Sequence, residues 1–240
     1  MEELLRFKKL YAILSFIFLL NLLLWSGSRY ERAAWDNIPP APSQEAVSAM
    51  TLGDPQLAYR ILGIMLQNFG ETGGRSTVFQ DYNYQHLGDW FLLEHFLEPR
   101  SDFVPFLAAY YFGASNVKED LNYVVDYLAK AGKYDMPNKW RWLAQAIFIA
   151  RFQQEEKEKA LEMAYDLARI DYPGMPGWSK QMPAFILADL GNKEAAYVFL
   201  MQLLQDGVQK FHPAEVNFMR GYICEKVLSS NEARLNPVCQ

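Results

Sequence analysis

Histidines and carboxylates are the residues of this sequence that could perform acid–base chemistry or hold a metal ion. His86 and His95 are nine residues apart, whereas two ligands on one helix face need a spacing of about four. An acid–base pair would need two carboxyl groups that converge in a pocket with shifted pKa values. Glu94 and Glu98 are four residues apart on the helix that carries Asp89, a spacing typical of a solvated helix face. This pattern predicts no catalytic residue and no metal site.

The segment at 70–75, GETGGR, is the place where the backbone could approach a phosphate group most closely. Phosphate-binding loops follow a strand and carry GK[ST] or GxGxxG before a helix, and neither context is present. We interpret the segment as a loop between helices, and we predict no cofactor. Tyr82 and Tyr84, in the unrepeated segment at 70–85, are candidates for contact with a partner protein.

The two cysteines, Cys224 and Cys239, are too far apart for a CxxC motif and have too few neighbouring ligands for zinc. In an exported protein they would form a disulfide, since Asn236 and Pro237 let the tail fold back on the helix of Cys224. In a reducing compartment they would be a buried thiol and a thiol in the tail. Both alternatives are open at this point.

Composition predicts a folded protein with a substantial core. The chain has 240 residues, of which 51% are hydrophobic and 15% aromatic, a composition that argues against intrinsic disorder. Its formal net charge of −5 argues against nucleic acid as a partner, because nucleic-acid binding needs a basic face. An acidic body is also a poor match for an anionic membrane leaflet.

The first predicted element of the chain is an apolar segment near the N-terminus. Residues 10–25, LYAILSFIFLLNLLLW, contain no charged residue. At about 1.5 Å per residue this run is short for a hydrocarbon core of about 30 Å, but Lys8 and Lys9 can extend to the interface. We predict a transmembrane anchor at 10–27. The alternative is a cleaved signal peptide, for which Ser26-Gly27-Ser28 supplies small residues at the cleavage site.

Charge around this segment predicts its orientation. Arg6, Lys8 and Lys9 precede it, which favours a cytoplasmic tail at 1–9 and an extracytoplasmic body, in the periplasm if the organism is bacterial. Arg29 and Arg32 on the other flank make this bias modest. The alternative of a cleaved signal peptide exports the body as well.

The rest of the chain is predicted to be an extended linker at 28–55, rich in proline, followed by an all-α domain at 56–240. Segments in which apolar residues recur at helical spacing are separated by Gly, Pro and Asn. No segment alternates apolar and polar residues strictly enough to require a strand. This periodicity predicts helices at about 56–68, 84–97, 103–115, 118–131, 138–152, 156–170, 178–190, 193–206 and 214–229.

The predicted helices form pairs that can be aligned as three copies. The first helices align through Ala109, Ala146 and Ala184, and the second helices through Ala160 and Ala196. Small residues at these points let two helices approach closely. Repetition of helix pairs with short turns predicts stacked helical hairpins.

Over residues 100–206 the sequence resembles the tetratricopeptide repeat (TPR), a helix–turn–helix of about 34 residues with a large residue and then small residues at set positions. Trp142, Ala146 and Ala160 follow that order, and LGNKEAAYVFL at 190–200 is similar to the turn into the second helix. Lys180 departs from the pattern, Pro183 interrupts a first helix, and the copies are longer than the family's. The resemblance implies a right-handed solenoid whose concave face binds a peptide of another protein; a generic bundle of hairpins is the alternative.

Three aromatic residues, Phe103, Trp140 and Trp178, precede the three aligned alanines by six positions. In the repeat family this position faces the concave groove, and the resemblance implies a role in partner binding; the alternative is packing between helices. We therefore expect a membrane-anchored extracytoplasmic scaffold that binds other proteins and is not an enzyme. The other hypotheses are a structural subunit of a larger membrane complex and an envelope enzyme or accessory factor with an unrecognised pocket.

Overall fold

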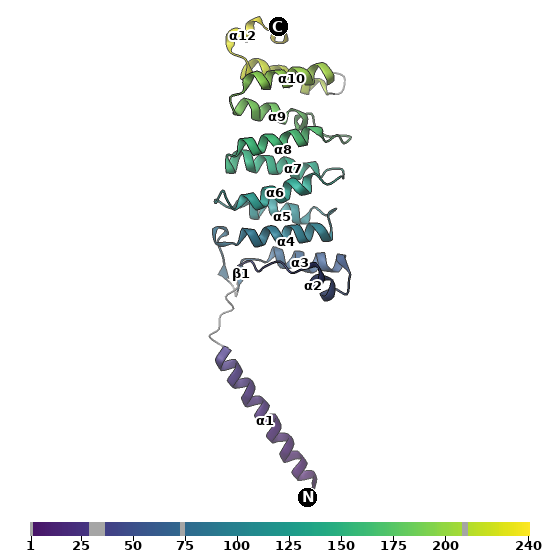
Figure 1. Cartoon of the computed structure of the whole chain (residues 1–240), viewed down its shortest axis with the longest axis vertical. Coiled ribbons are helices and arrows are strands. Elements are labelled where there is room, and N and C mark those ends of the chain that lie inside the picture. The colour runs from purple at the N-terminus through teal and green to yellow at the C-terminus, as the bar shows by residue number, and fades with distance from the viewer. Residues whose placement is uncertain (1, 29–36, 73–74, 208–210) are drawn as a thin grey trace. The chain divides into compact units, whose positions relative to one another are not determined.

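The computed structural model describes residues 2–28, 37–72, 75–207 and 211–240. It divides into two units, Met1–Asp36 and Asn37–Gln240, which we describe separately. The protein is all-helical, with 73% of its residues in helices, as the sequence predicts (Figure 1). Within the described ranges, the extended pairing is limited to an antiparallel ladder between β1 (Glu71–Thr72) and β2 (Arg75–Ser76).

The first unit is a single helix, α1 (Glu2–Ser28). Its segment Lys8–Gly27 is 20 residues long, has no buried residue and is apolar enough to cross a membrane. At about 1.5 Å per residue, such a segment matches a hydrocarbon core of about 30 Å. The span therefore includes the predicted anchor at 10–27 and extends two residues further toward the N-terminus.

The second unit begins earlier than the sequence predicts. The extended linker predicted at 28–55 is wrong from residue 37 onward, because Ile38 is buried in the core and helix α2 (Gln44–Met50) buries Val47. The Trp90 indole Nε1 donates to the Pro39 carbonyl over 2.8 Å. Prolines hold this segment extended, and its free carbonyls then accept hydrogen bonds from the helical body. Residues 29–36 of the predicted linker lie outside the described residues.

The remaining helices match the predicted ranges to within a few residues at most ends. Short α2 and α12 were not predicted, and two helices continue as π-helical turns, α7 through Ile149–Gln154 and α11 through Ile223–Val227. The bounds are α3 (Pro55–Gln67), α4 (Tyr84–Leu97), α5 (Phe103–Tyr110), α6 (Leu121–Gly132), α7 (Trp140–Phe148), α8 (Lys157–Arg169), α9 (Trp178–Asp189), α10 (Lys193–Gly207), α11 (Pro213–Tyr222) and α12 (Ser230–Leu235). Three short 3-10 helices, Phe79–Asp81, Phe112–Ala114 and Pro237–Cys239, complete the set.

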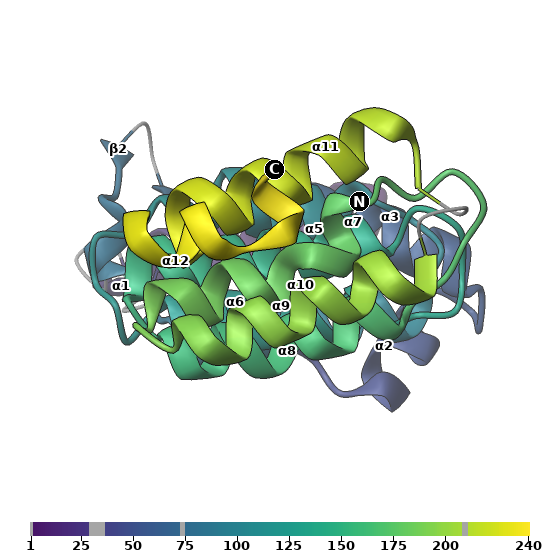
Figure 2. The same ribbon diagram turned by 90° about the horizontal axis from the view of Figure 1, so that it is seen from above.

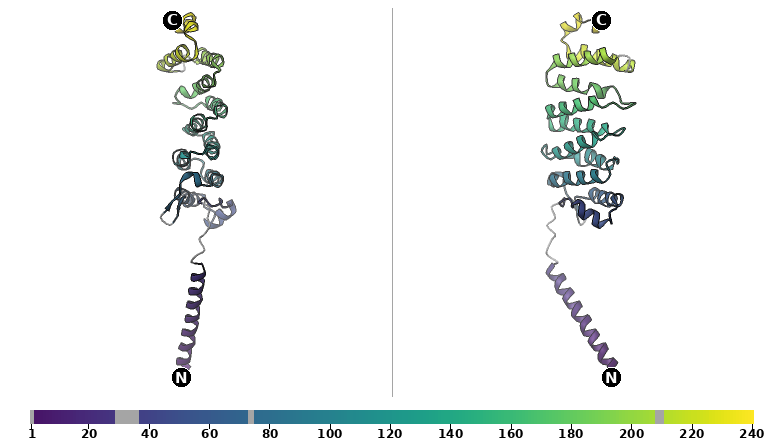
Figure 3. Two further views of the ribbon diagram at one scale, coloured as in Figure 1. Left: turned by 90° about the vertical axis from the view of Figure 1, so that its left-hand side faces the viewer. Right: turned by 45° about the vertical axis from the view of Figure 1, so that its right-hand side comes forward.

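Successive helices of the second unit pack on one another in chain order (Figures 1 and 2). They alternate between two layers, which the left panel of Figure 3 shows as two columns. Contacts of α5 with α7, and of α4 with α6, join alternate helices within a layer. We call α5, α7, α9 and α11 the first layer, and α4, α6, α8 and α10 the second layer.

Small residues lie where helices approach most closely. The aligned alanines of the first layer are buried, and Ala160 and Ala196 of the second layer are fully buried. Gly132 at the end of α6 is another such point, since an added Cβ would be 2.2 Å from the backbone nitrogen of Leu143 on α7. The sequence pattern of small residues therefore predicts the close helix contacts correctly.

Candidate interaction surface

The three aromatic residues aligned by the repeats do not line an open groove together. Trp140 is only 7% exposed and belongs to the core, whereas Trp178 is 38% exposed and meets the Trp140 ring edge-on at 5.7 Å. Phe103 lies over Gly63 of α3, where an added Cβ would be 3.3 Å from the ring. The partner-binding role expected for Trp140 is therefore wrong, because this side chain fills space between α7 and its neighbours.

Tyr82 and Tyr84 are also core residues, which corrects their expected role in partner contact. The Tyr82 hydroxyl donates to the Phe69 carbonyl over 3.0 Å, and the Tyr84 hydroxyl donates to the Phe112 carbonyl over 2.7 Å. Burial raises the pKa of Tyr82 to about 12. The segment before α4 folds back on the helices, and burial of both rings with satisfied hydroxyls follows from that fold.

The structure instead places another set of aromatic side chains on the first layer. Three pairs of aromatic residues, each with a spacing of four, lie on α5, on α7 with its π-helical turn, and on α11. One further aromatic residue lies on α7 and one on α9. We call this set the aromatic face: Phe106, Tyr110, Trp142, Phe148, Phe152, Phe185, Phe218 and Tyr222. Five members are exposed, and Trp142, Phe185 and Tyr222 are partly buried.

Ring contacts cross between helices of the aromatic face at two places. Tyr110 of α5 meets Trp142 of α7 at a centroid distance of 6.5 Å. Phe185 of α9 meets Phe218 of α11 at 6.0 Å and Tyr222 at 4.8 Å. These contacts join α5 to α7 and α9 to α11, whereas Phe148 and Phe152 between them contact each other at 5.1 Å.

Charges on this face are held in pairs. The Arg151 guanidinium lies over the Phe152 ring at 4.6 Å and donates through Nε to Asp189 of α9 over 2.7 Å. The pKa of Tyr222 is raised, first by burial and then by the Asp189 carboxylate, with Arg151 opposing this effect. The face therefore offers partly desolvated aromatic groups with one paired cation, a composition enriched in protein interfaces.

The second layer differs in character. Lys159 of α8 pairs with Asp126 of α6 at 2.9 Å, and Lys133, which follows α6, pairs with Asp166 of α8 at 2.5 Å. Exposed ion pairs of this kind are typical of a solvated surface and contribute little to binding. The second layer also exposes Phe96 of α4 and Tyr123 of α6, but exposed aromatic residues are more numerous on the first layer, which we take as the candidate interaction surface.

The alignment of the repeats did not predict this face, because its members are not one equivalent residue in each repeat. A usable signal was present in the spacing of Phe106 with Tyr110, Phe148 with Phe152, and Phe218 with Tyr222. Residues four apart share one helix face, and both members of a buried pair would point inward. Only the packing showed that these pairs point outward.

Glu94 is the most unusual polar residue of the body. Its side chain is fully buried, and within the described part of the chain neither carboxyl oxygen has a hydrogen-bond partner. Burial raises the pKa of Glu94 to about 8. The solvated face predicted for Glu94 and Glu98 is therefore wrong for Glu94, whereas Glu98 pairs with Arg100 at 2.7 Å.

A buried lysine lies at the start of α7. The Lys139 ammonium donates to the Ser101 carbonyl over 2.7 Å and to Asp102 Oδ1 over 2.8 Å. Burial lowers the pKa of His95, with smaller effects from Lys130 and Lys139. These contacts hold the α4–α5 connection to α7, and no group of three potential metal ligands occurs among the described residues.

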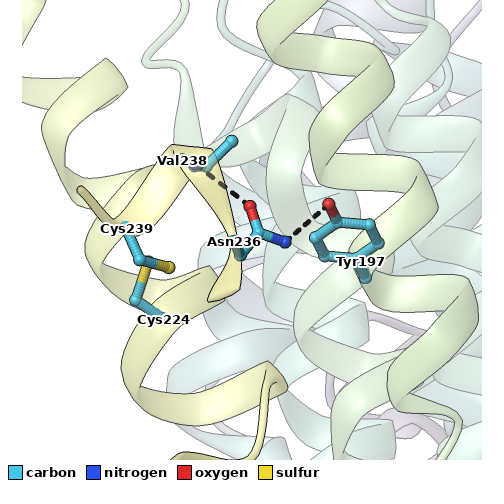
Figure 4. Close-up of a disulfide and its surroundings, with 5 residues drawn as sticks. All are labelled: Tyr197, Cys224, Asn236, Val238 and Cys239. Carbon is cyan, nitrogen blue, oxygen red and sulfur yellow. Dashed lines mark hydrogen bonds between the residues drawn. A yellow bond between two sulfur atoms is a disulfide. The ribbon is translucent and has the colours of Figure 1, made fainter. Parts of the chain in front are cut away.

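The C-terminal segment is held by a disulfide between Cys224 and Cys239, with the two Cα atoms 5.8 Å apart (Figure 4). Asn236 stands beside it, donating from Nδ2 to the Tyr197 hydroxyl over 2.9 Å and accepting from the Val238 backbone nitrogen over 3.0 Å. The disulfide joins the last residues of the chain to the π-helical turn after α11, and the bond from Asn236 to Tyr197 joins them to α10.

No family model, no curated protein and no solved structure matches the chain.

Proposed function

We propose that this protein is a membrane-anchored scaffold whose helical body captures a partner protein on the aromatic face. The observation that supports it best is the set of exposed rings on α5, α7 and α11, of which Tyr110 contacts Trp142 of α7 and Phe218 contacts Phe185 of α9. Exposed aromatic side chains that are held in place supply contact area with little loss of conformational entropy, and such residues are enriched among binding hot spots.

The finer architecture we propose is a TPR-like right-handed solenoid, with the aromatic face on its concave side. The alternation of helices between two layers and the burial of Ala146 and Ala160 support this arrangement. A concave surface would suit an extended or helical peptide, since such a ligand could contact several helices at once.

The location we propose is a single-pass membrane protein with its N-terminus in the cytoplasm and its body outside. The apolar span Lys8–Gly27 and the cationic residues that precede it support this topology. The disulfide between Cys224 and Cys239 is also consistent with an oxidising compartment, where such bonds persist.

Photocrosslinking in cells tests the capture function. A photoreactive amino acid at Phe152, in the full-length chain, should give discrete crosslinked products with a partner protein. The matched control is Tyr165 on α8, an aromatic residue that contacts Phe199 of α10 in the second layer. Equal crosslinking at the two positions would contradict the proposal.

A substitution complements the crosslinking. Phe148→Ala and Phe152→Ala remove exposed rings, so we expect unchanged thermal stability and a loss of partner capture equivalent to about 2 kcal/mol. Tyr165→Ala should leave capture unchanged.

A further inference from the structure

The first helices of the body carry a second exposed apolar surface, at a distance along the chain from the aromatic face. We call it the α3 patch, and it consists of exposed residues of α2, of the α2–α3 turn and of α3: Met50, Leu52, Leu57, Ile61, Ile64 and Met65. These exposed aliphatic side chains all lie within residues 50–65, and so many in one short segment are unusual for a surface in contact with water.

Helix α3 is apolar on both sides. Its inner side buries Ala58, Leu62 and Leu66 in the core. On its outer side Leu57, Ile61 and Ile64 recur at the same helical spacing and are exposed. A surface helix ordinarily has polar residues outward, so the outer side of α3 has the composition of a surface that something else covers.

The turn before α3 presents a leucine outward in an unfavourable conformation. Leu52 is 97% exposed and has φ of +54°, in the left-handed region that side chains with a Cβ rarely adopt. Backbone hydrogen bonds from Thr51 to Val47 over 3.1 Å and from Gly53 to Ser48 over 2.8 Å fix this turn. Residues in sparsely populated regions concentrate at functional sites, and this one contributes nothing to the core.

Charged side chains on the patch are few. Among the described residues of α3, the exposed charged side chain is that of Arg60, and the helix contains no carboxylate, while Glu45 is exposed at the start of α2. Asp54 in the turn is the N-cap of α3 and accepts from the backbone nitrogens of Gln56 at 2.9 Å and Leu57 at 3.1 Å. Aliphatic side chains with one cation match the boundary between lipid phosphates and acyl chains.

The chain itself keeps this surface near the membrane. Helix α1 ends at Ser28 and the compact body begins at Asn37, so only residues 29–36 connect them. A connection of this length spans at most roughly 30 Å when fully extended. Once α1 is inserted, the start of the body is therefore confined near the bilayer, which makes a weak surface affinity effective.

We propose that the α3 patch is a membrane-docking surface, which inserts its aliphatic side chains into the leaflet on the body's side and places Arg60 among the lipid phosphates. This inference rests on the membrane anchoring in the proposed function but not on the aromatic face. Docking would hold the body by two attachments, the anchor and the patch, and so restrict its rotation about the tether.

Fluorescence quenching by labelled lipid tests this proposal on the full-length chain in phosphatidylcholine vesicles. Because both native cysteines are in the disulfide, Leu52→Cys supplies a single thiol for a polarity-sensitive fluorophore. Val198→Cys is the control, since Val198 is exposed on α10, far along the stack. We expect blue-shifted emission at position 52 and at least about twofold more quenching by shallow nitroxide lipid than at position 198.

A double substitution in the patch supplies the second measurement. Ile61→Ser with Ile64→Ser, in the chain labelled at position 52, should lower quenching to the level at position 198. Both side chains are exposed, so the melting temperature should not change. Quenching at position 52 that never exceeds the control level would overturn the docking proposal.

Carbonate extraction of the same vesicles distinguishes the two proposals. Extraction of the protein would remove the anchoring premise, and with it the membrane part of the proposed function. Retention with equal quenching at positions 52 and 198 would overturn docking alone. Crosslinking between copies through position 52, with no lipid quenching, would assign the patch to a second copy of the chain and overturn docking as well.

Discussion

At the scale of single residues, Glu94 dominates the pH behaviour of the body. A carboxyl group without hydrogen-bond partners in an apolar site is stable only when it is neutral, and burial accordingly raises its pKa to about 8. Its neighbours include Tyr59 and Tyr127, whose pKa values are raised mainly by burial and further by the Glu94 charge. The folded protein therefore keeps a proton on the Glu94 carboxyl group at pH values where the unfolded chain releases it.

We expect the stability of the body to fall as pH rises from about 4.5 to about 8. In that window the folded protein keeps the Glu94 proton and the unfolded chain loses it, so the free energy of unfolding drops by up to about 1.4 kcal/mol per pH unit. Glu94→Gln should remove this fall and raise stability at pH 8, which leaves the opposite contribution of His95, whose lowered pKa makes stability rise with pH up to about 6.5. Thermal or urea unfolding across this range measures the effect.

The matched control is Glu98→Gln on the same helix. The Arg100 side chain holds the pKa of Glu98 at about 2, so this carboxylate contributes nothing to a slope above its unfolded value. Glu98→Gln should therefore leave the pH dependence between about 4.5 and 8 in place. A Glu94→Gln variant with the wild-type slope would show that another group titrates in this window.

The two contacting tryptophans should respond differently to truncation. Trp140 is buried, so Trp140→Ala should destabilise the fold by roughly 3–5 kcal/mol through lost contacts and a cavity. Trp178→Ala should cost much less, because that ring already meets solvent on one side. Melting temperatures of the two variants measure the difference, and equal losses would contradict the burial assigned here.

At the scale of secondary-structure elements, the disulfide decides whether the C-terminal segment stays on the stack. Residues 228–240 contain α12 and a 3-10 helix with no buried residue of their own. The disulfide closes a loop across a sequence separation of 15. In the chain-entropy model, a loop of this length stabilises the folded state by roughly 3 kcal/mol.

Cys224→Ser with Cys239→Ser should therefore free this segment while the remaining helices stay folded. The expected result is faster amide hydrogen exchange in 228–240 and unchanged exchange in α4 to α9. Asn236→Ala, which removes the hydrogen bond to Tyr197 and keeps the bridge, is the milder comparison. Unchanged exchange at the C-terminus of the double variant would show that other contacts hold the segment.

At the scale of the whole molecule, topology determines which partners the aromatic face can reach. Glu158→Cys places a thiol on the exposed side of α8, away from both proposed binding surfaces. It should react with a membrane-impermeant thiol reagent in intact cells, because the cationic residues before the anchor favour an exported body. Glu3→Cys should react only after lysis. The reverse pattern of labelling would show that the body lies in the cytoplasm and would contradict the proposed topology.

Local features of the sequence determined the helices and the close contacts between them. Apolar spacing predicted helix α4 at its observed bounds, and aligned small residues such as Ala146 and Ala160 predicted where helices meet. These properties depend on residues within a few positions of one another, so they can be read from one segment at a time. Helices α2 and α12, with seven and six residues, are too short to show such a period.

Burial, in contrast, was decided by the tertiary structure. Glu94 and Glu98 share a helix and a charge, yet one is enclosed and the other pairs with Arg100. Trp140 is enclosed while Phe148, eight residues later, is exposed. A side chain is buried when segments distant in sequence pack over it, and the free energy of that packing depends on all the segments that meet there, so no single segment carries enough information to determine it.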